Sequence, residues 1–320
     1  MKAIGLHQYR GPEVLHAIEL PTPRPASGQV RIKVCAAGIN PVDEMLRTGA
    51  LATWYGDTPR PYVPGMDVAG IIDAIGPDMP PESGMAVGQP VVGIVDNFGS
   101  VGGYSEYVCL PAPSVMPIPA GVTFAPAASF LMNALTARNA LDHLALPRGA
   151  SILVTGAAGA VGAYTMALAN AEGLKTVAVA SAEDEDFLRQ RGATHVVGRG
   201  ERLSERIRER VHEGVDAIVD AAGIRRDVVG AVRDGGTIIN LRPEPDETLE
   251  RGIVTRFVNV RDHATDHAAI ARLGQQVSEG LLPLRVAAIF PASEAVAAHR
   301  RFDAGKLRGR IVLDFEQSGL

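Results

Sequence analysis

The chain is poor in cysteine and has no long apolar run, and both absences narrow what it can be. Its 320 residues include two cysteines, Cys35 and Cys109, each within a strand-like apolar stretch. Two such thiols supply neither a disulfide framework nor a thiolate zinc site, so we interpret both as packing residues. No segment approaches the ~20 apolar residues that cross a bilayer, and polar residues from His7 onward interrupt any signal peptide. We therefore expect a soluble, cytoplasmic protein.

Positive charge is also in short supply. The chain has 31 Lys and Arg against 36 Asp and Glu, which gives a formal net charge of −5. This balance provides no overall field to attract a phosphate polymer, although residues 202–210 form a local charged run. We expect neither nucleic acid nor a membrane as a partner.

The length of the chain favours two domains, each able to bury its own apolar interior. Residues 1 to about 122 are rich in Gly and Pro and predict an antiparallel, barrel-like β domain. Its expected strands are 30–35, 68–75, 90–95 and 104–110. The part from about Asp262 is expected to return to this domain, with helices at 262–280 and 293–305 and strands at 286–290 and 310–315.

From Pro126 onward, short apolar strands alternate with helix-length segments. The expected strands are 151–155, 176–180, 195–197, 217–220 and 236–241. Strands spaced in this way imply right-handed βαβ crossovers and a parallel, doubly wound sheet.

The most informative segment joins the first of these strands to an Ala-rich helix through a Gly/Ala turn. Gly159 has no Cβ and lets a pyrophosphate approach the backbone, while Gly162 lets the helix pack closely on the sheet. Such turns also occur in α/β proteins that bind nothing, but the strand before and the helix after this one favour a dinucleotide site. The expected cofactor contacts here are Ala157, Ala158, Gly159, Ala160, Val161 and Gly162.

The end of the next strand bears on the choice of cofactor. An NAD-specific site would place Asp or Glu there, whereas this chain has Ser181, whose neutral hydroxyl accommodates a 2′-phosphate. NADPH is therefore favoured over NADH. The acidic run 183–186 would repel that phosphate if it turned toward it, although such a run at a helix start is typically solvated. Arg189, Arg199 and Arg202 are candidate phosphate partners.

Several segments together resemble the medium-chain dehydrogenase/reductase superfamily, and within it the zinc-free quinone oxidoreductases related to zeta-crystallin. The resemblance covers nearly the whole chain. It implies a GroES-like, β-barrel-type catalytic domain from residues 1–122 and 262–320, and a Rossmann domain from residues 123–261. Its specific segments are residues 36–43, 47–49, 63–70, 135–137 and 308–313, with the loop at Gly159.

The resemblance also bears on metal binding. Asn40 and Met66 stand where zinc-dependent relatives have Cys and His ligands, and the Cys-rich zinc lobe is missing. His263 and His267 are spaced like helical ligands, but a solvated helix face explains them better. We expect no metal.

The family pattern implies roles for several residues. Asn40 would lie beside the nicotinamide and the substrate carbonyl, the alternative being a turn residue that satisfies its own backbone. Thr136 would contact the cofactor near its carboxamide or ribose. Asp43 is expected to order the site through Arg47 or another base, and Asp67 is expected to pair with Arg310.

The same pattern, with the switch-point rule, predicts further contacts around the cofactor and substrate. Many relatives have an aromatic hydroxyl at the position of Met45, so their substrates do not transfer directly. Flat apolar walls are expected from Trp54, Tyr55 and Phe98, although plain packing explains aromatic loop residues equally well. Met45 and Met66 are further expected substrate contacts. Cofactor contacts are expected from Ala221, Ala222, Asn240 and Leu241 at strand ends, and from Phe257, Val258 and Asn259.

Without a metal, the chain is suited to electron-poor acceptors. We expect hydride transfer from NADPH to a quinone or an α,β-unsaturated carbonyl, with Asn40 donating to the developing oxyanion and water delivering the final proton. One alternative is a substrate-specific enoyl or enone reductase of a biosynthetic pathway. Another is a non-catalytic, crystallin-like NADPH-binding protein. Relatives commonly dimerise through sheet edges, so a homodimer joined at an edge strand, residues 257–260, is expected.

Overall fold

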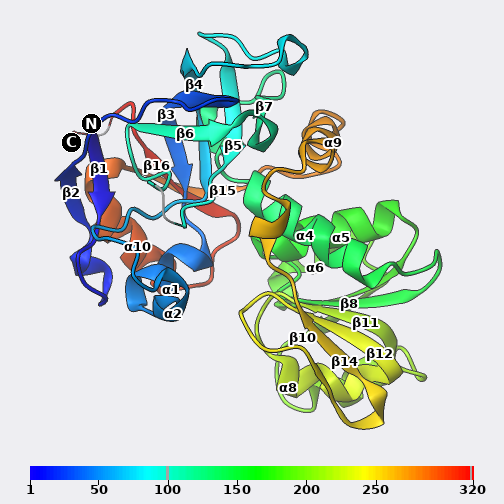
Figure 1. The fold of residues 1–320 in the computed structure, drawn as a ribbon. Coiled ribbons are helices and arrows are strands. Elements are labelled where there is room, and N and C mark those ends of the chain that lie inside the picture. The colour runs from blue at the N-terminus through cyan, green and yellow to red at the C-terminus, as the bar shows by residue number, and fades with distance from the viewer. Residues whose placement is uncertain (99–100, 318) are drawn as a thin grey trace. The chain divides into compact units, whose positions relative to one another are not determined.

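The computed structural model describes residues 1–98, 101–317 and 319–320 (Figure 1). The chain divides into two compact units. One comprises Met1–Met132, Ala264–Ser278 and Leu284–Leu320, and the other comprises Asn133–His263 and Glu279–Pro283. The first break falls later than residue 122, because the short helix α3 (Phe124–Ala127) packs against strands of the first unit. In the described ranges, no helix is long and apolar enough to cross a membrane.

The first unit is built on a seven-stranded sheet in the order β15-β16-β3-β4-β5-β7, with β6 paired to β3. Its pairings are antiparallel except for β15 and β16, which are parallel because helix α10 connects them. A separate hairpin joins β1 to β2. The strands are β1 (Lys2–Gly5), β2 (His16–Glu19), β3 (Gln29–Gly38), β4 (Asp67–Ile75), β5 (Pro90–Ile94), β6 (Tyr107–Pro111), β7 (Val115–Pro117), β15 (Val286–Pro291) and β16 (Arg310–Asp314).

Helices of the first unit begin and end where the sequence supplies caps. α1 starts at Pro41, which has no N–H to lose there, and ends at Gly49 in the left-handed conformation, with φ 84°. α9 was expected from residue 262 but begins at His267, because Asp266 accepts the Ala269 N–H at 3.0 Å and caps it. The helices are α1 (Pro41–Thr48), α2 (Ala52–Tyr55), α3, α9 (His267–Ser278) and α10 (Ala295–Asp303).

The second unit contains a doubly wound sheet in the order β10-β9-β8-β11-β12-β14-β13. Its strands are parallel except β13, which pairs antiparallel with β14. The strands are β8 (Ser151–Thr155), β9 (Lys175–Ala180), β10 (His195–Gly198), β11 (Val215–Asp220), β12 (Val232–Asn240), β13 (Glu247–Thr248) and β14 (Val254–Phe257). The helices are α4 (Leu131–Leu144), α5 (Ala160–Ala171), α6 (Glu185–Arg189), α7 (Leu203–Arg208) and α8 (Arg225–Val228). The predicted parallel sheet is thus confirmed.

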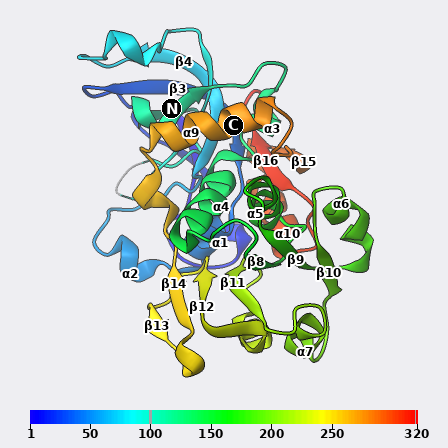
Figure 2. The ribbon, with the colours of Figure 1, turned by 90° about the vertical axis from the view of Figure 1, so that its right-hand side faces the viewer.

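Side chains of different size cover the two faces of this sheet. Small residues such as Ala178 and Ala180 face α5 and α6, whereas the alternate positions Val177 and Val179 pack with residues of α7 and α8. Figure 2 shows α5 beside β8 and β9, which it contacts. Alanine under α5 lets this helix lie close to the strands.

Two expectations about the chain near residue 260 were wrong. β14 ends at Phe257, and the two-residue strand β13 forms the sheet edge, so residues 257–260 are not an edge strand. The Val258 N–H instead donates to the Asn240 carbonyl at 3.2 Å, and a 3-10 turn follows from Val260. His263 ends that turn whereas His267 begins α9, so the two histidines do not share a helix.

Candidate cofactor and substrate sites

The turn after β8 has the backbone geometry of an anion site. Gly156 adopts φ 58°, and a Cβ on Gly162 would stand 2.2 Å from the Gly156 carbonyl oxygen. Gly159 is the N-cap of α5 and has no side chain to accept the first-turn amides. The N–H groups of Ala160, Val161 and Gly162 therefore remain for an external acceptor such as a phosphate oxygen.

Two of the predicted contacts in this turn also take part in packing. Ala157 and Ala158 are buried in the cluster beneath α5. The Ala157 N–H donates to the Val179 carbonyl at 3.2 Å, so this amide is already used within the protein. Contact of Ala157 and Ala158 with a cofactor stays a prediction.

A hydrogen-bond clasp joins the turn to the neighbouring strand β11. Thr155 Oγ1 donates to Asp220 Oδ1 at 2.5 Å and accepts the Ala222 N–H at 3.0 Å. β8 and β11 are adjacent in the sheet, and helices leave it in opposite directions from this pair, which makes it the topological switch point. Ligands of doubly wound sheets bind outside the strand ends at such a point.

The other predicted cofactor contacts lie along the same carboxyl edge of the sheet. Ser181 follows β9, Ala221 and Ala222 follow β11, and Leu241 follows β12. Asn240 ends β12 and is 5% exposed, yet its Nδ2 has no hydrogen-bond partner among the described residues. A buried amide without a partner costs stability unless a ligand satisfies it.

The remaining residues of this set differ in accessibility. Phe257 ends β14 level with Asn240, and Val258 is buried beside it. Asn259 turns away into its own loop, where its side chain bonds Asp262 and the Arg261 N–H, each at 3.3 Å. Thr136 lies on α4 and is 7% exposed. The edge therefore fits a dinucleotide through the amides at Gly159 and the carboxamide of Asn240.

In the first unit, Asn40 is fixed by two buried carboxylates. It is the N-cap of α1 and is 0% exposed. Its backbone N–H donates to Asp43 Oδ2 at 2.7 Å, and its Nδ2 donates to Asp67 Oδ2 at 3.0 Å. The side-chain amide thus reaches across to another strand, which goes beyond a turn residue that serves only its own backbone. Contact with a nicotinamide or substrate stays a prediction.

Asp43 is the acceptor of a larger buried network. Besides Asn40, it accepts the Gly65 N–H at 2.8 Å and the Tyr104 hydroxyl at 3.3 Å. Tyr104 in turn lies 3.1 Å from Nε2 of His299, a buried residue on α10. Asp43 therefore ties the Asn40 turn to the segment that carries Met66.

Burial sets the protonation of this network. It raises the pKa of Asp43 to about 7, although the bonds from Asn40, Gly65 and Tyr104 act in the opposite direction. Burial, with the charge of Arg47, lowers the pKa of His299 to about 3, so its ring is neutral. With Tyr104 donating to Asp43, the His299 Nε2 carries the hydrogen that Tyr104 accepts.

Arg47, named as one possible base for Asp43, pairs with another carboxylate. Arg47 is 1% exposed and forms a two-pronged ion pair with Asp303 of α10 at 2.8 Å. Asp67 accepts the Met132 N–H at 2.8 Å as well as the amide of Asn40. Burial raises the pKa of Asp67 to about 6, while the charge of Arg310 acts to lower it.

The aromatic residues predicted for the substrate site do gather. The ring centroid of Phe98 lies 5.9 Å from that of Trp54 and 4.6 Å from that of Tyr55. Trp54 is 40% exposed, whereas Tyr55 is buried behind it. Met45 is half-buried against the core, and Met66 is 1% exposed. Trp54 is thus the most exposed member of this set, while Phe98 and Met45 are half-buried.

Sequence reasoning missed Tyr104, His299 and Asp303. No local pattern marks them, because Tyr104 and His299 are 195 positions apart and Arg47 and Asp303 are 256 apart. A buried arginine needs an acidic partner, but the burial of Arg47 is visible only in the structure. Among the residues that the structure describes, no three His, Cys, Asp or Glu side chains gather in a way that could hold a metal ion.

Comparisons with known proteins agree with this architecture. The alcohol dehydrogenase GroES-like domain model matches residues 26–120, and the zinc-binding dehydrogenase model matches residues 191–313. Quinone oxidoreductase from Rattus norvegicus is 30% identical over 333 residues, which cover 98% of this chain and 97% of that protein.

Two solved structures are similar over almost the whole chain. The quinone oxidoreductase from Coxiella burnetii has a TM-score of 0.84 at 27% identity, and the alignment covers 98% of this chain and 99% of that one. A mycobacterial protein complexed with NADPH has a TM-score of 0.86 at 27% identity, with 98% and 100% covered. A GroES-like unit and a Rossmann unit in one chain define the medium-chain dehydrogenase/reductase class. Within that class, this chain belongs to the quinone oxidoreductase family.

Proposed function

We propose that this protein is an NADPH-dependent, metal-independent reductase that transfers hydride to a quinone or another electron-poor α,β-unsaturated carbonyl. The observation that carries the proposal is the carboxyl edge of the parallel sheet, where the uncapped start of α5 faces the switch point and the buried amide of Asn240 awaits a partner. A rat relative named quinone oxidoreductase and a mycobacterial relative complexed with NADPH support the same assignment.

Different residues of the second unit would bind different parts of the cofactor. First-turn amides at Gly159 would hold the pyrophosphate, and Ser181 would lie at the adenosine ribose. Asn240, with Leu241 and Phe257, would border the nicotinamide end, where Asn240 Nδ2 gains its missing acceptor. When bound, NADPH supplies the hydride, and the protein supplies binding and orientation.

The first unit would present the substrate. Trp54 and Phe98 offer flat apolar surface of the kind that packs against a planar ring. Asn40 is held by Asp67. The family pattern places it beside the substrate carbonyl, where its amide would donate to the developing oxyanion. Asp43 is engaged by three donors and is positioned to fix Asn40 rather than to give up a proton. Water would deliver the final proton.

Without a Lewis acid, such a site suits acceptors that delocalise charge onto oxygen, which quinones and enones do. The test is anaerobic oxidation of NADPH and NADH with 1,4-benzoquinone, 9,10-phenanthrenequinone and a series of enones. Turnover of quinones with NADPH preferred is the expected result. Turnover of one enone alone would identify a substrate-specific enone reductase, and cofactor binding without turnover of any acceptor would identify a non-catalytic NADPH-binding protein.

Asn40→Ala provides a second test of the same mechanism. Loss of the amide should lower turnover with little effect on the affinity for NADPH, since the expected pyrophosphate and ribose contacts lie in the second unit and Asn40 lies in the first. Full activity of this variant would remove Asn40 from the mechanism. Metal analysis of active protein should find no stoichiometric zinc, and zinc at one ion per chain would refute the metal-independent part.

A further inference from the structure

Three neighbouring strand ends form a line along the sheet edge. In the β8–β9 pair, Thr155 lies opposite Val179, and the Ala157 N–H donates to the Val179 carbonyl, which places the turn beside Ser181. In the β9–β10 pair, Gly198 lies opposite Ala180, so the next residues, Arg199 and Ser181, are neighbours. Adjacent strands are ~4.8 Å apart. Arg199 is therefore one strand beyond Ser181 on the side away from the pyrophosphate turn.

Three arginines near this edge could meet a phosphate, and two of them are already neutralised. Arg189 pairs with Glu185 at 2.7 Å. Arg202 pairs with Glu205 in a two-pronged contact. Arg199 is exposed and, within the part of the chain that the structure describes, has no ion pair or hydrogen bond. It is the cation of the three that keeps its charge for a ligand.

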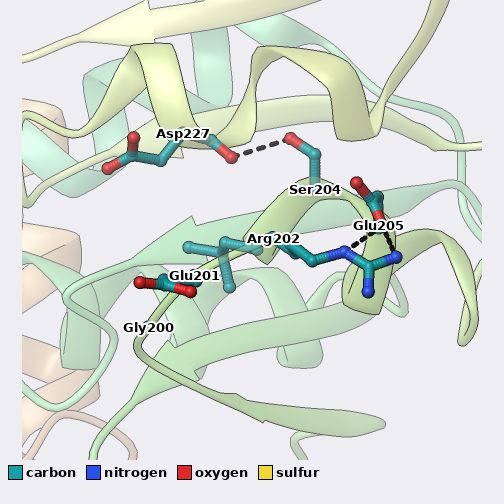
Figure 3. Close-up of a pocket in the computed structure, with 7 residues that line it drawn as sticks. Gly200, Glu201, Arg202, Ser204, Glu205 and Asp227 are labelled. Carbon is teal, nitrogen blue, oxygen red and sulfur yellow. Dashed lines mark hydrogen bonds and ion pairs between the residues drawn. The ribbon is translucent and has the colours of Figure 1, made fainter.

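The hollow next to Arg199 does not compete for that ligand. Figure 3 shows this pocket, which begins at Gly200 and is lined by the carboxylates of Glu201, Glu205 and Asp227. Its one cation, Arg202, is turned toward Glu205. An acidic lining of this kind repels a phosphate, so this hollow is not itself the phosphate site.

The acidic run after Ser181, residues 183–186, should repel a phosphate less than four free carboxylates would. Asp184 is buried, and Glu185 is held by Arg189. The charge of Glu185 is therefore offset by a cation within the protein.

We propose that Arg199 recognises the 2′-phosphate of NADPH and sets the preference for NADPH over NADH. The inference rests on the proposed function. The line from Ala157 through Ser181 to Arg199 follows the order of pyrophosphate, adenosine ribose and 2′-phosphate in a dinucleotide lying across three strands. A guanidinium donates two hydrogen bonds to a phosphate, and this pairing is charge-assisted.

The experiment measures binding by calorimetry, without any substrate. Wild type, Arg199→Ala and Arg199→Lys are titrated with NADPH, NADH and 2′,5′-ADP. Loss of a charge-assisted pair should weaken NADPH and 2′,5′-ADP binding by about 10- to 100-fold in Arg199→Ala, with NADH unchanged. Arg199→Lys should recover part of the NADPH affinity, because it restores the charge.

Arg202→Ala and Arg189→Ala are matched controls, since each removes an arginine that is already paired with a glutamate. Both should bind NADPH within about twofold of wild type. Arg199→Ala with unchanged NADPH affinity, or with NADPH and NADH weakened equally, would overturn the inference. Wild-type protein that binds neither cofactor would instead refute the proposed function, and that result would be seen before any variant is compared.

Discussion

Replacing Asp43 with Asn tests the buried network most directly. The carboxylate accepts hydrogen bonds from Asn40, Gly65 and Tyr104, and an amide can accept only on its oxygen. Losing one bond to a charged acceptor costs about 1.5–3 kcal/mol. Removing a desolvated charge offsets that cost, because burial raises the pKa of Asp43 from 3.8 to about 7. The absolute change in stability is therefore a difference between two terms of similar size.

The dependence of stability on pH separates these two terms. Because the pKa of Asp43 is raised in the folded state, this group contributes stability below pH 3.8 that is lost as the pH rises through 7. Each pH unit in that window is worth about 1.4 kcal/mol. Between pH 5 and pH 8, wild type should lose about 2–3 kcal/mol through Asp43 that Asp43→Asn does not lose.

The assay is urea unfolding of wild type and Asp43→Asn at both pH values. Asp73→Asn serves as the control, since it removes an aspartate in a partly exposed ion pair with Arg31. If Asp43→Asn lost as much stability as wild type between pH 5 and pH 8, the carboxyl would not titrate in this range and the reasoning would fail. Turnover should also fall, since Asp43 holds the backbone of Asn40.

Three further predictions follow from single contacts. Ser181→Asp should shift cofactor preference toward NADH by about tenfold or more, because a carboxylate repels a 2′-phosphate and accepts a ribose hydroxyl; calorimetry with an unchanged NADPH to NADH ratio would show that Ser181 does not face the ribose. Gly162→Ala should lower the free energy of unfolding by about 1–3 kcal/mol and weaken NADPH binding, since its Cβ would stand 2.2 Å from the Gly156 oxygen. As the control, Gly198→Ala should unfold like wild type, because a Cβ on Gly198 would have no atom within 4 Å. His299→Gln should lack the stability that wild type loses as the pH falls from 6.5 toward 3, because the pKa of His299 is lowered to about 3 in the folded state; identical acid unfolding curves would contradict this.

The parallel sheet could be predicted from the sequence because its signals are local. In a chain of alternating strands and helices, an apolar strand such as Ser151–Thr155 that is followed by a glycine turn predicts a parallel sheet. Asn240 could be placed at the carboxyl edge for the same reason, since strand order and direction bring these ends together. What the pattern could not give is that the Asn240 amide is buried without a partner.

The network around Asp43 could not be predicted in the same way. Arg47 lies four residues from Asp43, which makes an ion pair within α1 the obvious expectation, yet Asp303 from the last helix takes that place. Long-range partners such as Tyr104 and His299 depend on which strands and helices meet. The parallel β15–β16 pair escaped prediction for a related reason, since periodicity fixes a strand but not the direction of its neighbour.

Because the two faces of the parallel sheet carry side chains of different size, thermal stability and the geometry of the turn at Gly159 can be changed separately. Trimming Val177 or Leu153, on the side of α7 and α8, should create cavities and lower the melting temperature while the α5 amides keep their place. Enlarging Ala178, on the opposite side, should displace α5 and distort the turn at Gly159 even where the fold survives. Thermal stability can thus be changed from the α7 and α8 face of the sheet without moving the turn at Gly159 on its carboxyl edge.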